Sequence, residues 1–370
     1  MSAFDPSSPR PLYLQLAEYL RRQIESGALK PGERLMPELD LAEKYGLARG
    51  TVRQALQLLV NQDLVERMAG KGTFVTDKIA PSNSPLIGIV IPYLRDSLTV
   101  GILRGAESVL NLNGYSLIFG LSDASLELEC EQIKRLQRDN VSGLILFPVS
   151  ISGEALMLSQ ILRPDFPLVV IDRKIPELNT SSVFVDNRCG AYHAIEHLTA
   201  LGHKRIACIS HDGHVSSVAD RIRGYEQAMR AAGLTVLAAV SIVRREPTQD
   251  GQPPTYSDED MQPVDQLLQS PDRPSALFCI NDFIALGVMR HVQQRGFRVP
   301  DDIAIVGFDD IPLAPFLSVP LTTVAQPKFE IGAQAALLLL DIISGKEPAK
   351  RTIELSTSLV VRSSTNSNQR

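Results

Sequence analysis

The sequence predicts a small α+β head followed by an α/β body of two lobes, each built on a doubly wound parallel sheet. Three observations lead to this prediction. The chain has 370 residues, well beyond the roughly 100–200 residues of one ordinary core. Helical periodicity dominates the first 61 residues, whereas apolar runs alternate with amphipathic helices after residue 86. The stretch between these regions, Thr76 to Pro85, carries two prolines and small polar residues, as linkers do.

The chain is expected to divide into four segments that differ in charge. They are a head at residues 1–76, a linker at 77–85, a two-lobed body at 86–364 and a disordered tail at 365–370. Residues 1–78 carry 11 Lys and Arg against 10 Asp and Glu, while the remainder carries 26 against 32. Neither part is strongly basic, so contact with nucleic acid requires a local cluster of cations.

Composition excludes several classes of protein. Hydrophobic residues make up 44% of the chain and charged residues 21%, as in a globular protein. No apolar run approaches the roughly 20 residues that span a bilayer, so no membrane partner is expected. The N-terminus lacks the basic and apolar regions of a secretory signal, which indicates a cytoplasmic protein. The four cysteines are scattered without a CxxC pair, which favours buried thiols over a disulfide or metal site.

The sequence of the head predicts two helices, a turn, a third helix and a β-hairpin, in that order. Leucines and isoleucine at Leu16, Leu20 and Ile24 recur every fourth residue, and a glycine follows them. Pro37 can open a second helix over residues 38–44, and a third is expected from about Gly50 to Asn61. Two short strands, at residues 65–69 and 73–75, are joined through Gly70, Lys71 and Gly72.

The third helix of the head is a candidate for the major groove of DNA. Arg49 and Arg53 are four residues apart, hence on one face, and can reach phosphates or the guanine edge. Thr51 between them offers a hydroxyl or methyl group. Lys71 lies between two glycines at the hairpin tip, where the backbone can approach a phosphate closely. Taken singly, these arginines would also suit an ordinary solvated helix.

The head resembles the winged helix-turn-helix of GntR-family bacterial regulators over residues 11–75. The similarity is carried by PLYLQLAEYLRRQIESGALKPGERL, LARGTVRQAL and LVERMAGKGTFV. The resemblance implies that double-stranded operator DNA is contacted by Arg49, Thr51, Arg53, Lys71 and Gly72. One position departs from the family pattern, because Leu39 stands where an arginine early in the second helix usually contacts DNA.

The body alternates strands with helices, which predicts parallel sheets covered on both faces. Strands are expected at 87–91, 115–119, 143–147, 168–171, 182–185, 205–209, 276–280 and 303–307. Helices are expected at 102–112, 126–138, 191–201, 219–231 and 282–295. So many strands in about 280 residues favour two lobes over one sheet.

Ligands of parallel sheets bind beyond the carboxyl ends of the strands, so the residues at these ends are candidates. Carboxylates and an arginine around a cleft suit the vicinal hydroxyls of a sugar. Two of the aspartates, Asp186 and Asp282, could instead be helix caps. The strand ends are Tyr93, Phe147, Asp172 with Arg173, Asp186 with Asn187, Ser210 with His211, and Asn281 with Asp282.

The body, from Leu86 to about Arg362, resembles the sugar-sensing domain of the LacI and galactose repressor family, which has a type I periplasmic-binding-protein fold. The similarity is carried by IGIVIP, VVIDR, HLTALGHKRIACI, RIRGY, CINDFIALG, IAIVGFDD and PLTTVAQPKFEIGAQAALLLL. It implies effector contacts at Asp172, Arg221 and Asp282, with Asp309 and Gln326 near a crossing between the lobes. The usual aromatic after the first strand is replaced by DSLT, so Tyr93 is expected to stack on the effector.

A GntR-type head on a LacI-type body resembles the arabinose-repressor subgroup. The resemblance implies a homodimeric transcriptional repressor controlled by L-arabinose or a related sugar, with no cofactor. The alternative is an activator, or a regulator that needs a corepressor and senses another ligand such as a nucleoside.

An enzyme and a transport-type binding protein are the alternatives to a regulator. No GxGxxG, GxxxxGK[ST], GxSxG or HExxH motif supports an enzyme, and no catalytic residue is assigned. His193 and His197 are four residues apart on a helix, but no third metal ligand is evident near them. A transport-type binding protein would share the body, whereas the head and the N-terminus argue against it.

Overall fold

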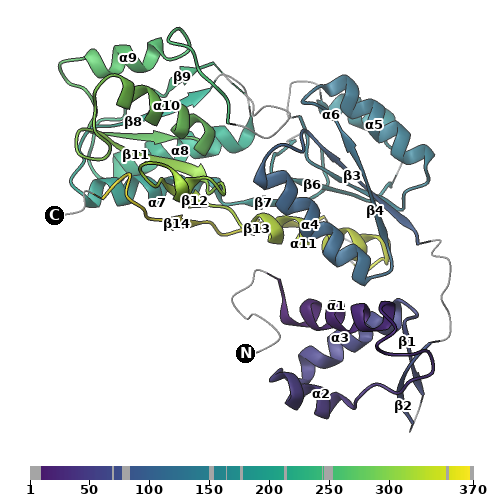
Figure 1. Cartoon of the computed structure of the whole chain (residues 1–370). Coiled ribbons are helices and arrows are strands. Elements are labelled where there is room, and N and C mark those ends of the chain that lie inside the picture. Colours follow the sequence, from purple (N-terminus) through teal and green to yellow (C-terminus); the bar gives the residue numbers. More distant parts are fainter. Residues whose placement is uncertain are drawn as a thin grey trace.

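The computed structural model describes a head and two lobes (Figure 1). Most of the predicted linker, at 77–83, and the end of the predicted tail, at 367–370, lie outside the described residues. The described ranges are 10–68, 71–76, 84–149, 154–163, 165–175, 178–211, 215–243, 245, 253–346 and 350–366.

The head contains the predicted elements in the predicted order. Its helices are α1 (Leu12–Glu25), α2 (Glu38–Tyr45) and α3 (Arg49–Asn61). The strands β1 (Val65–Met68) and β2 (Gly72–Val75) form an antiparallel hairpin, the wing, with Val65 opposite Val75. Gly46 ends α2 with φ of 65°, a left-handed conformation that glycine adopts without steric cost, and so allows the tight turn into α3.

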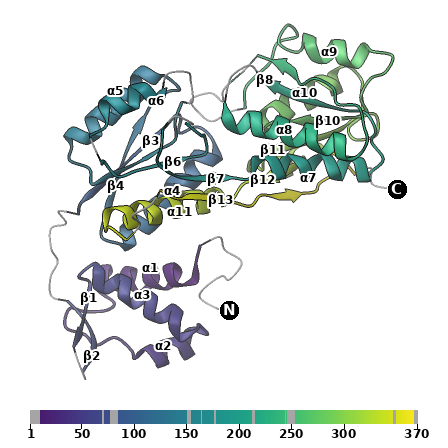
Figure 2. The same cartoon turned by 180° about the vertical axis from the view of Figure 1, so that it is seen from behind.

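The N-lobe is a six-stranded parallel sheet covered by helices on both faces (Figure 2). Its strands run in the order β13-β7-β6-β5-β3-β4. Helices α5 and α6 cover one face, and α4 and α11 cover the other. The bounds are β3 Leu86–Ile91, α4 Ser97–Leu112, β4 Ser116–Leu121, α5 Leu126–Arg138, β5 Gly143–Leu146, α6 Glu154–Ile161, β6 Leu168–Ile171, β7 Ser181–Val185, α11 Lys328–Ile343 and β13 Thr352–Leu355.

The C-lobe repeats this architecture with the order β14-β12-β11-β10-β8-β9. All its strand pairs are parallel except β12 with β14. Helices α7 and α8 lie on one face, and α9 and α10 on the other (Figure 2). The bounds are α7 Asn187–Ala200, β8 Ile206–His211, α8 Ser216–Ala231, β9 Val240–Ile242, α9 Gln262–Gln269, β10 Ala276–Cys279, α10 Asp282–Gln294, β11 Ala304–Asp309, β12 Thr322–Ala325 and β14 Ser358–Val360, with a 3₁₀ turn at Ala314–Phe316.

The predicted fold class is confirmed, and the differences concern four short strands and the bounds of some helices. Strands β9, β12, β13 and β14 were not predicted, because each has only three or four residues and little apolar periodicity. Helix α4 begins at Ser97 rather than Ile102, because the carboxylate of Asp96 accepts a hydrogen bond from the amide of Thr99 at 2.8 Å and caps the helix.

The chain crosses between the lobes three times, and one crossing carries α11 against α4. The crossings follow β7, β12 and β13. Gly105 and Gly332 bring α4 and α11 into backbone contact, since a Cβ at either position would lie 1.9 Å from a carbonyl oxygen of the other helix. The two helices therefore form one close-packed unit behind the N-lobe sheet.

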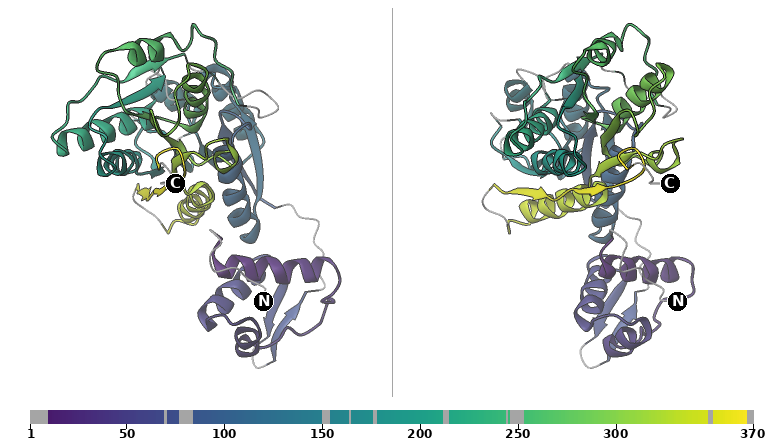
Figure 3. Two further views of the ribbon diagram at one scale, coloured as in Figure 1. Left: turned by 60° about the vertical axis from the view of Figure 1, so that its left-hand side comes forward. Right: turned by 90° about the vertical axis from the view of Figure 1, so that its left-hand side faces the viewer.

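The head lies against this unit, with α1 facing α4 and α11 (Figure 3). Arg21 of α1 donates to the side-chain oxygen of Asn111 at 2.6 Å, and Gln62 donates to the backbone oxygen of Asn111 at 2.6 Å. Asn111 stands in the last turn of α4, so one helix runs from the head to the space between the lobes. Within the described part of the chain, none of the helices has the length and apolar character needed to cross a membrane.

Candidate functional site

The head presents its predicted DNA-binding residues on one surface. Arg49 and Arg53 begin α3 with side chains 57% exposed, and Thr51 between them is half-buried. Lys71 is exposed at the wing tip, and Gly72 follows it with φ of 120°. The structure therefore brings the predicted residues of α3 and the wing to an accessible part of the head, while their role in DNA binding stays a prediction.

One carboxylate joins the recognition helix α3 to the wing. Glu38, at the start of α2, lies 3.8 Å from Arg49 Nε and 3.3 Å from Arg53 Nε. Its other oxygen lies 3.4 Å from the Nη2 atom of Arg67 on β1. Because guanidinium groups from α3 and β1 meet at the same acid, these two elements share one face. Glu38 and Arg67 were not among the residues predicted for this surface, because they are 29 residues apart and no local motif indicates that they form an ion pair.

Two further positions on the head bear on DNA contact. Leu39 is 59% exposed on α2, so the residue that departs from the family pattern is accessible to solvent. Arg34, also missed by sequence reasoning, lies beside the wing, because a Cβ at Gly72 would come 2.7 Å from its Nε. Arg34 therefore adds a cation beside Gly72.

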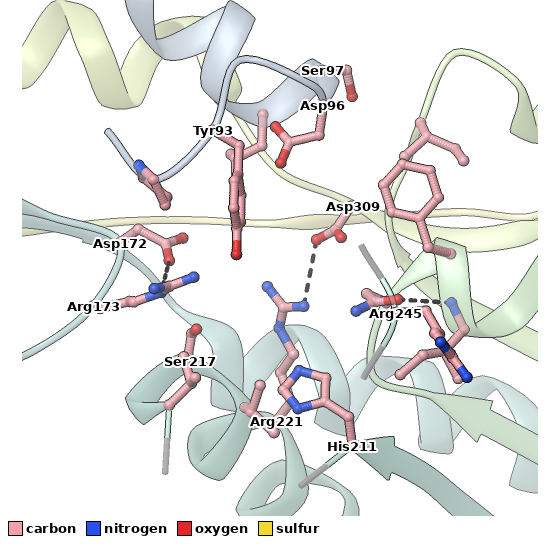
Figure 4. Close-up of a pocket in the computed structure, with 18 of the residues that line it drawn as sticks. Tyr93, Asp96, Ser97, Asp172, Arg173, His211, Ser217, Arg221, Arg245 and Asp309 are labelled. Carbon is pink, nitrogen blue, oxygen red and sulfur yellow. Dashed lines mark hydrogen bonds and ion pairs between the residues drawn. The ribbon is translucent and has the colours of Figure 1, made fainter. Parts of the chain in front are cut away.

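Between the lobes lies a cleft of about 120 Å³, lined from both sheets (Figure 4). Of the predicted effector residues, Tyr93 and Asp172 reach it from the N-lobe, and Arg221 and Asp309 from the C-lobe. Figure 4 shows Tyr93 and Arg221 pointing into the same space from opposite sides. The remaining walls include Asp96, Phe147, Arg173, His211, Ser217, Arg245, Asn281 and Phe283.

Arg221 is held rigidly at the floor of the cleft. Its Nε donates to Asn187 at 2.8 Å, and its Nη1 donates to the backbone oxygen of Ile280 at 2.6 Å. The same Nη1 lies 3.4 Å from Asp309, and the guanidinium stacks 3.7 Å from the centre of the Phe308 ring. These contacts leave the guanidinium a single orientation, which suits recognition of a small ligand.

Asp172 is the acid with an unused acceptor. Its Oδ2 lies 3.7 Å from Arg173 Nε, whereas its buried Oδ1 has no hydrogen-bond partner among the described residues. Burial raises the pKa of Asp172, although the charges of Arg173 and Arg221 oppose the shift. Its backbone has φ of 62°, a left-handed conformation that places the carboxylate at the strand end. A ligand hydroxyl would supply the missing hydrogen bond.

Two predicted effector residues lie behind the cleft rather than in it. Asp282 is fully buried and accepts hydrogen bonds from the Thr323 hydroxyl at 2.5 Å and the Ile311 amide at 2.9 Å. Burial, followed by the charge of Asp309, raises the pKa of Asp282 to about 8. Gln326 donates to Asp309 at 2.6 Å and lines a different cavity. Both residues therefore support the cleft through their neighbours in this structure.

The capping alternatives divide between the two aspartates. Asp186 caps α7 by accepting a hydrogen bond from the amide of Cys189 at 2.8 Å, which confirms the helix-cap alternative for this residue. Asn281, not Asp282, caps α10, because its oxygen accepts from the amide of Ile284 at 2.8 Å. The capping interpretation of Asp282 is wrong, since its carboxylate reaches across the sheet to β12.

Asp309 connects the cleft to the residues behind it, because it lies beside Arg221 in the cleft and accepts a hydrogen bond from Gln326. Burial raises the pKa of Asp309 to about 6, while Arg221 and Lys328 oppose that shift. Lys328 at the start of α11 donates to Ser97 of the N-lobe at 2.8 Å and to the backbone oxygen of Asp310 in the C-lobe at 2.9 Å. The cleft therefore has a hydrogen-bonded link between the lobes at one edge. Burial lowers the pKa of Lys328.

Comparison with known proteins matches two parts of the chain to known families. Residues 12–75 match the gntR family of bacterial regulatory proteins, and residues 195–365 match the periplasmic binding protein-like domain. The arabinose metabolism transcriptional repressor of Geobacillus stearothermophilus is 33% identical, with 96% of this chain and 98% of the relative covered. The transcriptional repressor CytR of Escherichia coli is 30% identical, with 88% and 95% covered.

Solved structures show the same body. A LacI family transcriptional regulator from Enterococcus faecium with bound ribose is 27% identical with a TM-score of 0.61, covering 75% of this chain and 98% of that one. The lac repressor dimer bound to operator and an anti-inducer is 25% identical with a TM-score of 0.65, covering 78% and 96%. The chain belongs to the gntR family of bacterial regulatory proteins with a LacI-type, periplasmic-binding-protein-like domain, and it is a DNA-binding transcriptional repressor.

Proposed function

We propose that a small sugar, L-arabinose or a related one, binds between the lobes and controls the affinity of the head for operator DNA. The observation that carries the proposal is the Oδ1 atom of Asp172, which has no hydrogen-bond partner among the described residues and belongs to the lining of the same cleft as the fixed guanidinium of Arg221. The small cleft volume of about 120 Å³ favours one small ring over a larger ligand. The names of the arabinose repressor and of the ribose-bound regulator support the same class.

Calorimetry with L-arabinose, D-ribose and adenosine tests the ligand. Wild-type protein should bind one of the sugars, and Asp172→Asn should weaken it by about 1–3 kcal/mol because a hydrogen bond to a charged group is lost. The matched control is Asp301→Asn on the surface of the C-lobe, where Asp301 pairs with Arg298 at 3.4 Å. Tight binding of adenosine with no response to either sugar would favour the nucleoside alternative instead.

The direction of control is tested by reciprocity. A sugar that releases the repressor lowers operator affinity, and a coupling of about 1–3 kcal/mol is typical. Operator DNA must then weaken sugar binding by the same factor, since linkage is symmetric. Equal dissociation constants of the sugar with and without operator would show that the two sites are not coupled. Tighter sugar binding in the presence of operator would show that the sugar is a corepressor.

We also propose that the chain acts as a cytoplasmic homodimer, with a regulatory rather than catalytic cleft. Two heads on one palindrome raise affinity beyond what a single head of modest charge supplies. Phe316 is 82% exposed on the C-lobe, next to a groove lined by Leu286, Met289 and Leu317, so a second copy could bury the ring symmetrically. Sedimentation should show a dimer that Phe316→Glu converts to monomers, and a wild-type monomer would overturn this proposal.

A further inference from the structure

A second cavity lies where the head meets the N-lobe. Its volume is about 680 Å³, and it is lined by three separate parts of the chain. Arg22 comes from α1 of the head, Arg104 and Ser108 come from α4, and Gln326 comes from the crossing that precedes α11. In Figures 1 and 3, α1 runs beneath α4 and α11 at this position.

The described lining of this junction cavity has more cations than carboxylates. Three guanidinium groups share the single carboxylate of Glu18, at 3.9 Å for Arg10, 3.2 Å for Arg21 and 2.9 Å for Arg22. Arg104 is exposed on α4 and forms no ion pair within the described ranges. Burial lowers the pKa of Arg10, and the charges of Arg22 and Arg21 lower it further against the opposing acids. Counted over the described residues, five cations face three acids, Arg10, Arg21, Arg22, Arg104 and Lys328 against Glu18, Glu107 and Asp310.

Two buried polar atoms of the cavity lining lack a partner. The side chains of Ser108 and Gln326 are more than nine-tenths buried. Among the described residues, neither Ser108 Oγ nor Gln326 Oε1 has a hydrogen-bond partner. The amide nitrogen of Gln326 donates to Asp309, and its Oε1 is an acceptor that needs a donor. The hydroxyl of Ser108 can donate or accept. A ligand that satisfies both atoms therefore carries at least one donor, such as a hydroxyl group, in addition to a negative charge that suits the cations.

We propose that the junction cavity is a second ligand site, which binds a small phosphorylated polyol. A phosphate group carries nearly two negative charges at neutral pH and matches the excess of two cations in the described lining. The planar guanidinium groups of Arg22 and Arg104 suit its oxygens, and the ligand hydroxyls reach Ser108 and Gln326. This site is separate from the sugar cleft, although the two are linked through the hydrogen bond from Gln326 to Asp309.

The position of this site gives it a regulatory consequence. Its ligand would contact the head through Arg22 and the N-lobe through Arg104, and so hold the head on α4. Because Asp309 lies in the sugar cleft and is paired with Gln326, occupation of one site changes the surroundings of the other. Phosphate ester and sugar are therefore expected to alter each other's affinity.

Calorimetry on the full-length chain tests the site, with glycerol 3-phosphate as the probe. Glycerol and inorganic phosphate, the two parts of this molecule, are titrated separately for comparison. Glycerol 3-phosphate should bind more tightly than either part. Arg22→Ala and Arg104→Ala should each weaken it about tenfold or more, since each removes a charged hydrogen-bond donor. Arg138→Ala, the same change on the exposed end of α5, is the matched control and should leave affinity unchanged.

A cleft variant separates this proposal from the proposed sugar site. Asp172→Asn should leave the affinity for glycerol 3-phosphate unchanged, even if no sugar binds the cleft. The proposal is overturned if glycerol 3-phosphate does not bind, or if Arg22→Ala and Arg104→Ala bind it as tightly as wild type. Loss of binding in Asp172→Asn would also overturn it, because the phosphate ester would then occupy the cleft between the lobes.

Discussion

The head and the cleft both depend on arginine, but they place it in opposite surroundings. Arg49 and Arg53 of the head have side chains 57% exposed, whereas Arg173 and Arg221 of the cleft are 9% and 7% exposed. Exposed arginines attract a polyanion over a distance, and salt screens them. Buried arginines are already oriented by hydrogen bonds, so they select a small ligand by geometry.

Pairing differs between these regions as much as exposure does. In the head, three arginines share Glu38 at 3.3–3.8 Å, so their combined positive charge exceeds that of their partner. In the cleft, Arg221 has its own carboxylate and two further hydrogen-bond acceptors. The head therefore keeps positive charge available for phosphates. The cleft fixes Arg221 by hydrogen bonds and leaves Asp172 Oδ1, which has no partner among the described residues, for a ligand.

The largest expected effect comes from removing the buried arginine of the cleft. Arg221→Met leaves Asp309 without its guanidinium partner and should cost about 3–5 kcal/mol of unfolding free energy, measured in urea. Arg230→Met on the same helix is the control, because Arg230 pairs with Glu226 at the surface and should cost less than about 1 kcal/mol. Equal losses in the two variants would remove the distinction between buried and exposed arginine.

The exposed arginines should affect DNA binding rather than stability. Arg53→Ala should cost about 1–3 kcal/mol of operator affinity and leave sugar binding intact. It should also reduce the salt dependence by roughly one phosphate contact, since α3 then neutralises one phosphate fewer. Anisotropy titrations at several salt concentrations measure both quantities, with Arg138→Ala on α5 as a control of equal charge. An unchanged operator affinity together with an unchanged salt dependence would show that Arg53 does not contact the DNA.

The buried acid behind the cleft should give stability a pH dependence that the head does not share. The pKa of Asp282 is raised to about 8 from an ordinary 3.8, so the folded protein keeps a proton that the unfolded chain releases. The neutral carboxyl of Asp282 therefore contributes to the free energy of unfolding. The contribution is fully present below about pH 3.8 and is lost as the pH rises through about 8. Between these values, wild-type unfolding free energy should fall relative to Asp282→Asn, by at most about 1.4 kcal/mol per pH unit. Parallel profiles would show that Asp282 stays charged.

The smallest expected effect is at Leu39, where the head departs from its family. Leu39 is exposed, so Leu39→Arg should fold normally and add one cation to the surface near Glu38. General DNA affinity should rise, and its salt dependence should steepen by roughly one phosphate contact. Leu39→Gln, which adds polarity without charge, should leave the slope as in wild type. A slope that is also unchanged in Leu39→Arg would mean that this face of α2 does not meet DNA.

Some site residues could be predicted from local sequence, and others could not. Tyr93 and Asp172 follow apolar strands, and parallel strands bring their carboxyl ends to one edge, so their place at the cleft could be inferred. Asp309 was expected only from the resemblance to the LacI family. Asp96 was missed although the DSLT segment that contains it is a capping pattern for α4. Ser217 and Arg67 carried no such pattern, because they reach their sites only through the packing of α8 and of the wing.

The sequence by itself determined the order of head and body, the parallel sheets and the arginines of α3, because hydrophobic periodicity and turn residues act over a few neighbouring positions. Only the tertiary structure decided that Asp282 binds Thr323 across the sheet, while Oδ1 of Asp172 in the cleft has no partner among the residues that the structure describes. The two aspartates differ in this way because Asp282 meets Thr323, 41 residues further along the chain, whereas no described residue donates a hydrogen bond to Asp172 Oδ1. The same holds for Glu38, whose arginine partners lie on α3 and β1, and for the junction cavity, which forms where α1, α4 and the crossing before α11 come together.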